Sequence, residues 1–420
     1  MKKYSAYKPS GIEWIGDVPA EWKKCRFKNF ITLVSVAACG GNKIGMENIE
    51  SGSGKFLPSN ADFEGNGVAF SVGDVIYGKL RPYLMKVWIA EFDGNAVGDF
   101  FVFRPQKNAD SKFVKYLMLS DGFTKAANGA TEGAKMPRVS SDFIMTLKYF
   151  LPSKDEQIAI AAYLDAKCAK IDNVISVQQK RIELFKELKQ SVITNAVTKG
   201  LDKNIKLRPS GIDWIGSIPE KWKVMKLKHV LLDYRDGTHA SFPRVVSDYP
   251  LLSAKNVFED GIKITDEEST ISEDAYKSII SNGFPRFGDV AVCCVGTIGR
   301  CCLYTLKDPH AFQRSVTFLR PNKNALNSYL VYLMRSDVAN PQYVMYAKTS
   351  AQSGIYMDAL VNFKIVVPPK EEQIAIATYL EKKCSAIDSQ ISKIERQIEL
   401  LKEYKQSIIT ECVTGKRKVC

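Results

Sequence analysis

Two segments of the chain repeat apolar residues at an average spacing of 3.5 positions. In residues 151–200 these positions are Leu164, Cys168, Ile171, Ile175, Ile182, Phe185 and Val192. In residues 368–420 they are Leu380, Cys384, Ile387, Ile391, Ile394, Ile398, Leu401 and Ile408. This spacing keeps one stripe of side chains facing a partner helix and predicts a left-handed coiled coil.

Both segments also begin and end like long helices. Each opens with a proline and an acidic turn, which helix N-termini favour, and no further proline or glycine appears before Gly200 or Gly415. Helices this long exceed what one small domain can cover, although packing of each helix on its own domain is the alternative. We therefore predict an antiparallel pair with a seam of Ile171, Ile175, Ile182, Phe185, Ile387, Ile391, Ile394, Ile398 and Leu401.

The remainder of the chain is also written twice. PSGIEWIGDVPAEW at 9–22 recurs as PSGIDWIGSIPEKW at 209–222, and GDV at 73–75 recurs at 288–290. The helical segments 152–200 and 368–416 are identical at 28 of 49 positions, and the offset between copies grows from 200 to 216. The ends of the unit are thus held constant while its interior diverges.

The repeat predicts four parts, of which two are globular domains and two are long helices. Two α/β (α+β) globular domains occupy residues 1–150 and 201–367, and the two long helices occupy residues 151–200 and 368–420. A length of 420 residues and a hydrophobic content of 45% are sufficient for two such cores.

The net charge is +13, and the excess is spread over both copies and both helices. This distribution suits a long polyanion better than a single basic tail would. No apolar run reaches the roughly 18 residues needed to span a bilayer, and no apolar stretch follows the basic start as in a secretory signal. We expect a cytoplasmic protein without a membrane partner.

The ten cysteines do not suggest a disulfide framework or a metal site. Two pairs, Cys293–Cys294 and Cys301–Cys302, flank a glycine turn, whereas zinc ligands stand two to four residues apart within a pair. We interpret them as core residues of two buried strands, with a metal site as the minor alternative.

No catalytic constellation is evident. The GSG at 52–54 and GNG at 65–67 lack a strand-to-helix context, and the three histidines stand apart from any cysteine or acidic cluster. The acidic pair Glu267–Glu268 is expected to cover a solvated surface. The sequence therefore predicts a non-catalytic chain that binds no metal and no cofactor of its own.

Loops flanked by glycine carry the basic and amide residues that contact phosphates and base edges in DNA-binding proteins. In the first domain the candidate contacts are Lys55, Lys79, Arg81, Lys135 and Arg138. In the second domain they are Arg235, His239, Arg244, Lys255, Asn256, Arg300 and Gln352. The duplicated tryptophan segments are interpreted instead as packing surfaces against the helices.

The GIEWIGxVPxxW opening, the GDV and KLRPYL segments and the PxxEQxxIAxYL helix start closely resemble the specificity subunit of Type I restriction-modification enzymes. The resemblance implies two target recognition domains, each reading one half of a split DNA site, and helices that set the spacer. It also implies docking of two modification subunits, which bind S-adenosylmethionine and methylate adenine, and of restriction subunits that use ATP and magnesium.

Two alternatives belong to other classes of protein. One is an autonomous DNA adenine methyltransferase or nuclease with an unrecognised site, and the other is a coiled-coil adaptor that binds only protein. The diverged interiors between constant ends favour the specificity subunit, because variable recognition on a fixed scaffold produces that pattern.

Overall fold

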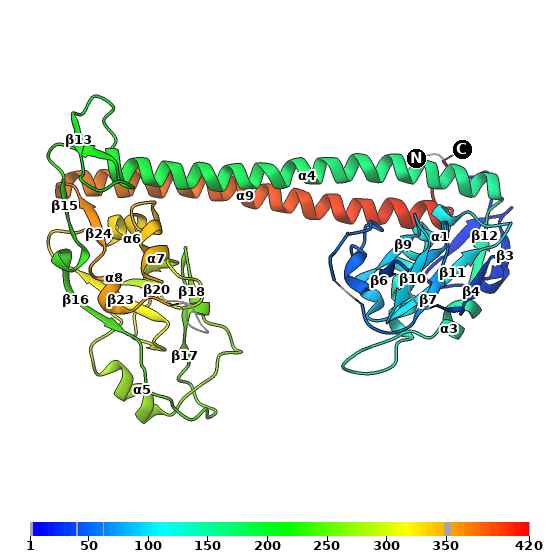
Figure 1. Ribbon diagram of the computed structural model, residues 1–420, viewed down its shortest axis with the longest axis horizontal. Coiled ribbons are helices and arrows are strands. Elements are labelled where there is room, and N and C mark those ends of the chain that lie inside the picture. The colour runs from blue at the N-terminus through cyan, green and yellow to red at the C-terminus, as the bar shows by residue number, and fades with distance from the viewer. Residues whose placement is uncertain (1–2, 39–40, 62, 348–353, 420) are drawn as a thin grey trace. The chain divides into compact units, whose positions relative to one another are not determined.

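A computed structural model describes residues 3–38, 41–61, 63–347 and 354–419. The chain divides into two compact units, the first built from two stretches of sequence and the second from one continuous stretch. The first unit comprises Met1–Gln179 with Ile394–Cys420, and the second comprises Lys180–Lys393. Each unit therefore contains one globular fold, one half of the central long helix and one half of the last helix (Figure 1).

The globular fold of the first unit is a mixed α/β structure of short strands and short helices. Its strands are β1 (Tyr7–Pro9), β2 (Asp17–Pro19), β3 (Lys23–Arg26), β4 (Ile31–Val34), β5 (Ala37–Ala38), β6 (Lys43–Ile44), β7 (Gly67–Phe70), β8 (Val75–Gly78), β9 (Val87–Ile89), β10 (Gly94–Val97), β11 (Phe100–Pro105) and β12 (Lys148–Leu151). Its helices are η1 (Phe27–Asn29), η2 (Met46–Asn48), η3 (Pro82–Leu84), α1 (Ser111–Met118), α2 (Asp121–Gly129) and α3 (Ser141–Thr146).

The second unit has the same class of fold. Its strands are β13 (Leu207–Pro209), β14 (Ser217–Pro219), β15 (Lys223–Lys226), β16 (Leu231–Asp236), β17 (Leu251–Leu252), β18 (Val257–Phe258), β19 (Gly261–Ile262), β20 (Val290–Cys293), β21 (Cys301–Leu303), β22 (Ala311–Phe312), β23 (Val316–Pro321) and β24 (Lys364–Val367). Its helices are η4 (Leu227–Val230), η5 (Ala254–Asn256), α5 (Glu273–Ile280), α6 (Asn327–Arg335), α7 (Asn340–Tyr346) and α8 (Met357–Leu360).

The sheets confirm that the two globular folds are copies. A four-stranded antiparallel sheet in the order β4-β11-β8-β9 recurs as β16-β23-β20-β21. A short parallel pair, β10 with β6, recurs as β22 with β17. The central strands β8 (VIYG) and β20 (VAVC) are buried throughout, and their β-branched and aromatic residues suit a two-sided core.

Two long helices confirm the prediction from the 3.5-residue spacing. Helix α4 (Lys154–Lys199) has 46 residues and α9 (Lys370–Val413) has 44. In the first unit Lys405 of α9 lies 2.7 Å from Asp172 of α4, and in the second unit Lys189 of α4 lies 2.8 Å from Asp388 of α9. From the first pair to the second, the α4 residue moves toward the C-terminus, from 172 to 189, while the α9 residue moves toward the N-terminus, from 405 to 388. The two helices are therefore antiparallel.

The start of each long helix is bound to its globular fold by a buried glutamine. Gln157 accepts a hydrogen bond from the backbone N–H of Asp110 and donates to two backbone carbonyls. Gln373 makes the same three contacts, with Leu326 as the N–H donor. These glutamines belong to the repeated EQIAIA sequence, so the repeat conserves an anchor that joins fold to helix.

The end of each long helix contacts a globular fold through a second repeated set. Gln406 and Thr410 of α9 bind backbone groups of the first unit. Their counterparts in α4, Gln190 and Thr194, bind backbone groups of the second unit. The first globular fold is therefore completed by residues of α9, which come late in the sequence.

The duplicated tryptophan segments pack where the long helices end. A methyl group added at Gly415 would lie 3.1 Å from the ring of Trp22, and one added at Gly200 would lie 3.2 Å from the ring of Trp222. Both rings are almost completely buried, and Trp222 donates to Glu372 of α9 at 2.8 Å. This supports their interpretation as packing surfaces.

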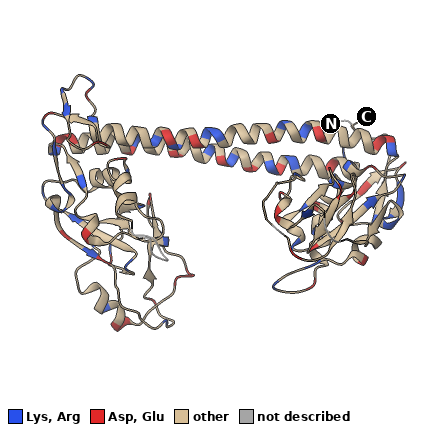
Figure 2. Ribbon diagram, in the orientation of Figure 1, with Lys and Arg blue, Asp and Glu red and all other residues tan. Residues whose placement is uncertain are grey.

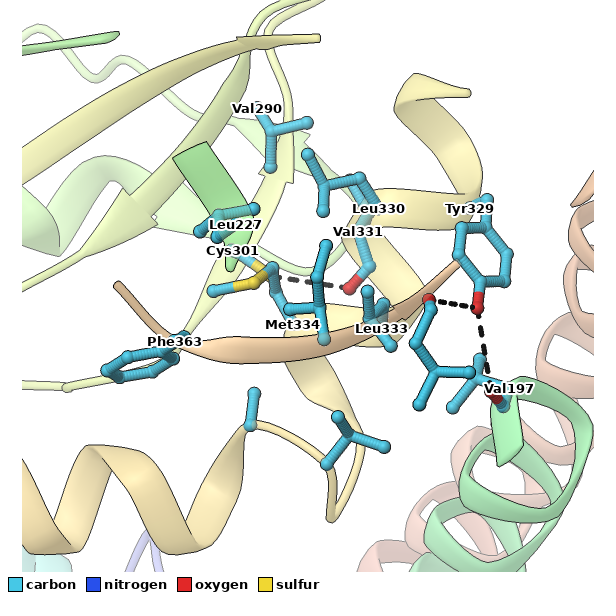
Figure 3. Close-up of a cluster of buried hydrophobic side chains, with 14 of the residues drawn as sticks. Val197, Leu227, Val290, Cys301, Tyr329, Leu330, Val331, Leu333, Met334 and Phe363 are labelled. Atoms are coloured by element: carbon cyan, nitrogen blue, oxygen red, sulfur yellow. Dashed lines mark hydrogen bonds between the residues drawn. The ribbon is translucent and has the colours of Figure 1, made fainter. Parts of the chain in front are cut away.

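The core of the second unit joins the sheet, α6 and the long helices (Figure 3). Tyr329 of α6 is buried, and its hydroxyl donates to the carbonyl of Val366 at 3.0 Å and lies 3.5 Å from that of Val197 in α4. The four vicinal cysteines lie in β20, β21 and the residue after β20, where all are buried. Burial raises the pKa of Cys302 to about 12, so its thiol stays protonated.

Two further surveys concern only the residues that the structure describes. None of their helices combines the length and the hydropathy required to cross a bilayer. No group of three or more histidine, cysteine or acidic side chains among them is arranged to hold a metal ion.

Candidate nucleic-acid interface

Three of the five candidate cations in the first unit lie on two loops that pair with each other. The backbone N–H of Arg81 donates to the carbonyl of Pro137 at 2.8 Å, and that of Val139 donates to the carbonyl of Lys79 at 3.1 Å. This pairing, together with the bridge between Leu80 and Arg138, brings Lys79, Arg81 and Arg138 together. Loops far apart in sequence thus form one basic cluster.

Asp99 organises this cluster. The guanidinium of Arg138 donates two hydrogen bonds to the Asp99 carboxylate, both at 2.9 Å, and Lys79 Nζ lies 3.8 Å from the same group. A bidentate pair of this kind fixes the direction of the guanidinium. Hydrogen bonding to Asp99 also raises the pKa of Arg138, so it remains a permanent cation.

The two remaining candidates of the first unit differ in position. Lys135 is exposed on the turn between Glu132 and Arg138, whose backbones pair through two hydrogen bonds of 2.9 Å, and so lies beside the cluster. Lys55 lies apart from it, because its Nζ is 3.8 Å from Asp172 on α4. Four candidates thus gather on one surface and the fifth borders the long helices.

Arg81 has a left-handed backbone conformation, with φ of 52°. Residues other than glycine rarely adopt this conformation. The strained residue is exposed and directly precedes Pro82, the first residue of η3. Strain of this kind is often retained where a side chain must project in a fixed direction.

In the second unit Arg235 lies near the end of β16, and His239 follows three residues after that strand ends. Arg235 is 3.6 Å from Asp233, and His239 Nε2 lies 3.3 Å from Asp236. Asp236 also accepts a hydrogen bond from Thr317 of β23, which fixes it to the central sheet. His239 and Arg235 remain exposed, as does Arg244 in the following loop.

Lys255 and Asn256 occupy different environments although they are adjacent. Lys255 is exposed and lies 2.6 Å from Glu268, whereas Asn256 is buried. The Asn256 amide accepts from Ser253 and donates to the Lys263 carbonyl and to Glu268. Because its donors and acceptor are used within the fold, we withdraw Asn256 as a DNA contact.

Glu268 corrects a second expectation, that the pair Glu267–Glu268 is a solvated surface. Glu267 is exposed, but the side chain of Glu268 is only 5% exposed. Burial alone would raise the pKa of Glu268, yet hydrogen bonds from Lys255 and Asn256 outweigh it and hold the pKa below its usual value. Glu268 therefore acts as a fixed anion inside the second fold.

Arg300 is partly buried at the glycine turn between β20 and β21. Its guanidinium donates to the carbonyl of Ala254 and lies 5.2 Å from the ring centre of Phe258. Gln352, the last candidate, lies outside the described residues. The second unit therefore distributes its cations over several loops, whereas the first unit concentrates them around Asp99.

The predicted helix seam follows the same geometry in both helices. Ile171, Ile175 and Ile182 of α4 are buried, as are Ile387, Ile394 and Ile398 of α9. Phe185, Ile391 and Leu401 are half-buried. Basic and acidic residues are interspersed along both long helices (Figure 2).

The sequence interpretation missed the acidic residues that hold cations in place. Asp99 was not identified, and Glu268 was expected to be solvated. The ion pair of Asp74 with Arg104 at 2.7 Å, which recurs as Asp289 with Arg320 at 2.7 Å, was not identified either. A signal for the recurring pair was present, since GDV and RP occur in both copies. No comparable repeat marks Asp99.

The sequence and the fold of this chain are similar to those of one group of known proteins. Residues 219–400 match the model of the Type I restriction modification DNA specificity domain. The chain is 25% identical to the Type I restriction enzyme MjaVIII specificity subunit of Methanocaldococcus jannaschii, over 96% of this chain and 94% of that protein.

Two solved structures share the fold. One, from a study of complex assembly and conformational transition in the type I R-M system, superposes with a TM-score of 0.72 at 18% identity and covers 94% of this chain and 98% of that one. The HsdS subunit from Thermoanaerobacter tengcongensis superposes with a TM-score of 0.50 at 18% identity and covers 95% and 98%. The fold likeness thus extends over nearly the whole chain.

Proposed function

We propose, from the premise that this chain belongs to the specificity subunits of Type I restriction-modification enzymes, that it recognises a bipartite DNA site. As a specificity subunit it is the non-catalytic recognition component of its complex. We assign the reading of one half-site to residues 1–150 and of the other to residues 201–367. The helical segments 151–200 and 368–420 set the spacer between the half-sites.

One observation carries this proposal: the two globular folds share their anchors to the helices but differ in the loops that bear cations. Gln157 and Gln373 make the same three hydrogen bonds in both copies. The first fold clusters its cations around Asp99, whereas the second has no counterpart of this cluster among the candidates discussed above. Constant attachment to the helices combined with a variable cation-bearing surface suits the recognition of two different half-sites.

Within this function, the candidate residues divide by chemistry. Arg138 and Arg81 can present a guanidinium to a guanine edge in the major groove, the commonest specific contact of arginine. The exposed lysines Lys79, Lys135 and Lys255 suit phosphates, which position a protein without reading sequence. Arg235, His239 and Arg244 extend the surface of the second fold from the end of β16.

The long helices also offer a repeated surface for protein partners. Apolar side chains are about half exposed at equivalent positions of the two copies: Ile158 with Ile374, Leu184 with Leu400, and Leu188 with Tyr404. Exposed apolar residues that recur at matched sites favour docking of two copies of one partner. We propose the two modification subunits as that partner, with restriction subunits joining them in the cytoplasm.

In this scheme the small molecules belong to the partners. S-adenosylmethionine binds to the modification subunits, and ATP and magnesium bind to the restriction subunits. This chain contributes recognition of the DNA sequence. The rival functions, an autonomous methyltransferase or nuclease and a protein-only adaptor, receive no specific support from the candidate surface described above.

The test is a map of methylated adenine in cells that express the chain with its modification subunits. The informative variant carries one extra heptad between residues 179 and 180 and one between residues 393 and 394. Seven residues add about 10 Å to a helix, which corresponds to roughly three base pairs. We expect unchanged half-sites separated by a spacer about three base pairs longer. An unchanged spacer would refute the role of the helices, and an absence of any split motif would refute the function.

A further inference from the structure

A recess in the first unit lies where the loop around Lys55 meets both long helices. Its volume is about 440 Å³, and its walls come from the Gly52–Lys55 turn, α1, α4 and α9. Lys55, Lys115 and Lys405 line it from three of these elements. Three cations from distant parts of the sequence therefore converge on one hollow.

Two of the lysines at this recess have an ion-paired carboxylate but no hydrogen bond to it. Each carboxylate already has a lysine within hydrogen-bond distance: Asp172 has Lys405 at 2.7 Å, and Asp165 has Lys112 at 2.8 Å. Lys55 and Lys115 lie 3.8 and 3.9 Å from the same carboxylates, which is too far for a hydrogen bond. Three lining lysines thus face two lining carboxylates, one of which is also paired with Lys112, and the surplus charge is positive.

Lys115 is the less accessible of the two loosely paired lysines. Its side chain is 14% exposed, and burial lowers the pKa of its ammonium despite the nearby Asp165. Burial of an ammonium is costly unless it is well paired, and the Asp165 carboxylate 3.9 Å away is shared with Lys112 and with the hydroxyl of Tyr116. An anion seated in the recess would offset that cost.

An equivalent recess exists in the second unit. Its volume is about 630 Å³, and it is lined by Asp388, Lys189 and Ile193. These are the same residue types, at an offset of 216, as Asp172, Lys405 and Ile409 of the first recess. The hollow is therefore a feature of the repeated unit.

The loops around the second recess differ from those of the first, yet its surplus charge has the same sign. Lys186, Lys189, Arg300 and Arg335 line it against two carboxylates, Glu259 and Asp388. Lys189 binds both carboxylates, at 2.7 and 2.8 Å. The Nε of Arg300 is buried and has no hydrogen-bond partner among the residues that the structure describes. Different residues have thus preserved a cationic recess.

We infer that each recess binds one phosphate group of the DNA backbone. The inference rests on the proposed function and adds to it two sequence-independent contacts, one where each recognition fold meets the helix pair. A lysine ammonium serves a phosphate as a compact point charge, and an arginine adds directed donors. Backbone phosphate is favoured over free phosphate because each recess is bordered by a cation-bearing loop of a globular fold to which we assign a half-site, with Lys55 in the first and Arg300 in the second.

The experiment measures the salt dependence of DNA binding by the complex with its modification subunits. Lys55→Gln and Lys186→Gln change one recess each, at side chains that are 60% and 57% exposed, so the fold is retained. Each loss of a phosphate contact lowers the slope of log K against log salt by about 0.9. We expect each variant to bind roughly two- to fivefold more weakly, with the methylated motif unchanged, and the double variant to lose about twice the slope.

Lys167→Gln is the matched control. Lys167 is an exposed lysine of α4 that lies over the ring of Tyr163, and its position two residues from Asp165 puts it on another side of the helix. Its slope should equal that of the unchanged protein. Slopes of the two recess variants that match this control would overturn the inference.

A second arm distinguishes the source of the phosphate. Inorganic phosphate is titrated against the complex without DNA and followed by calorimetry. If Lys55→Gln abolishes binding of inorganic phosphate but leaves the DNA slope unchanged, the recess serves a free anion and the DNA assignment is overturned. Failure of the unchanged complex to bind its methylated motif would instead refute the proposed function.

Discussion

The substitution Gln157→Leu tests the joint between the first recognition fold and the long helices. Gln157 is completely buried, and leucine has a similar size without polar atoms. The glutamine accepts from the N–H of Asp110 at 2.9 Å and donates to the carbonyls of Asn108 and Pro152, each at 3.0 Å. The substitution leaves all three backbone groups unsatisfied in the interior.

The expected magnitude follows from these three contacts. At about 1 kcal/mol for each buried hydrogen bond, their loss destabilises the joint by about 3 kcal/mol. Asp110 is also the N-cap of α1, where its side chain accepts from the N–H of Phe113. The damage should therefore reach α1, and the open form of this region should become on the order of 100-fold more populated.

Hydrogen–deuterium exchange of the full chain, read by mass spectrometry, is the appropriate assay because it resolves the units separately. Peptides covering α1 should exchange on the order of 100-fold faster in Gln157→Leu. The counterpart Gln373→Leu should accelerate α6 and leave α1 unchanged, because it binds Leu326 of the second unit. Ile158→Ala, at the adjacent exposed position, should change neither.

Exchange of α1 within twofold of the unchanged protein would refute the reasoning. It would mean that the repeated EQIAIA sequence is maintained by something other than this joint. Acceleration spread equally over both units would refute the view that each glutamine serves its own fold.

Two further predictions concern the helix ends and the response to acid. Gly200→Ala should destabilise the second unit by about 1–2 kcal/mol, the cost of a left-handed backbone. Gly415→Ala should destabilise the first unit by roughly 2–5 kcal/mol, because its methyl group would also overlap Pro19. Equal shifts of the two variants in urea unfolding would contradict this. Burial raises the pKa of Asp165, but hydrogen bonds including that from Lys112 outweigh burial and lower the pKa below 3.8. The ionised carboxylate therefore stabilises the fold above the unfolded pKa, and this stabilisation is lost as the pH falls through the folded pKa. Asp165→Asn should therefore flatten the stability profile in acid, and an unchanged acid midpoint would count against it.

The scaffold could be predicted from the sequence because its signals are periodic and repeated. The 3.5-residue spacing predicts α4 and α9, and the offset of 216 relates the anchors Gln157 and Gln373. Both signals are local or internal to the sequence, so they need no knowledge of the fold.

The candidate site could be predicted only as a set of cations. Whether a loop residue faces solvent or the interior depends on partners far along the chain. Asn256 resembled a base contact but caps a short helix and binds Glu268, because residues 253–256 turn back against the loop that follows β19. Arg138 depends on Asp99, 39 residues away, and no periodicity links the two.

Each globular fold is held by the start of one long helix and by the end of the other. This arrangement explains physically how the helices can stay constant while the loops of the folds vary. The first fold is anchored at one side by Gln157 of α4 and at the other by Gln406 and Thr410 of α9, and the second fold uses the counterparts Gln373, Gln190 and Thr194. Most of these contacts reach backbone atoms, so they place few demands on the side chains of the fold that they hold. A recognition fold can therefore change its loops, gain residues and acquire a new cation cluster without disturbing the helices. The same argument implies that residues 1–150 depend on α9, which supplies two of the three anchor residues named above.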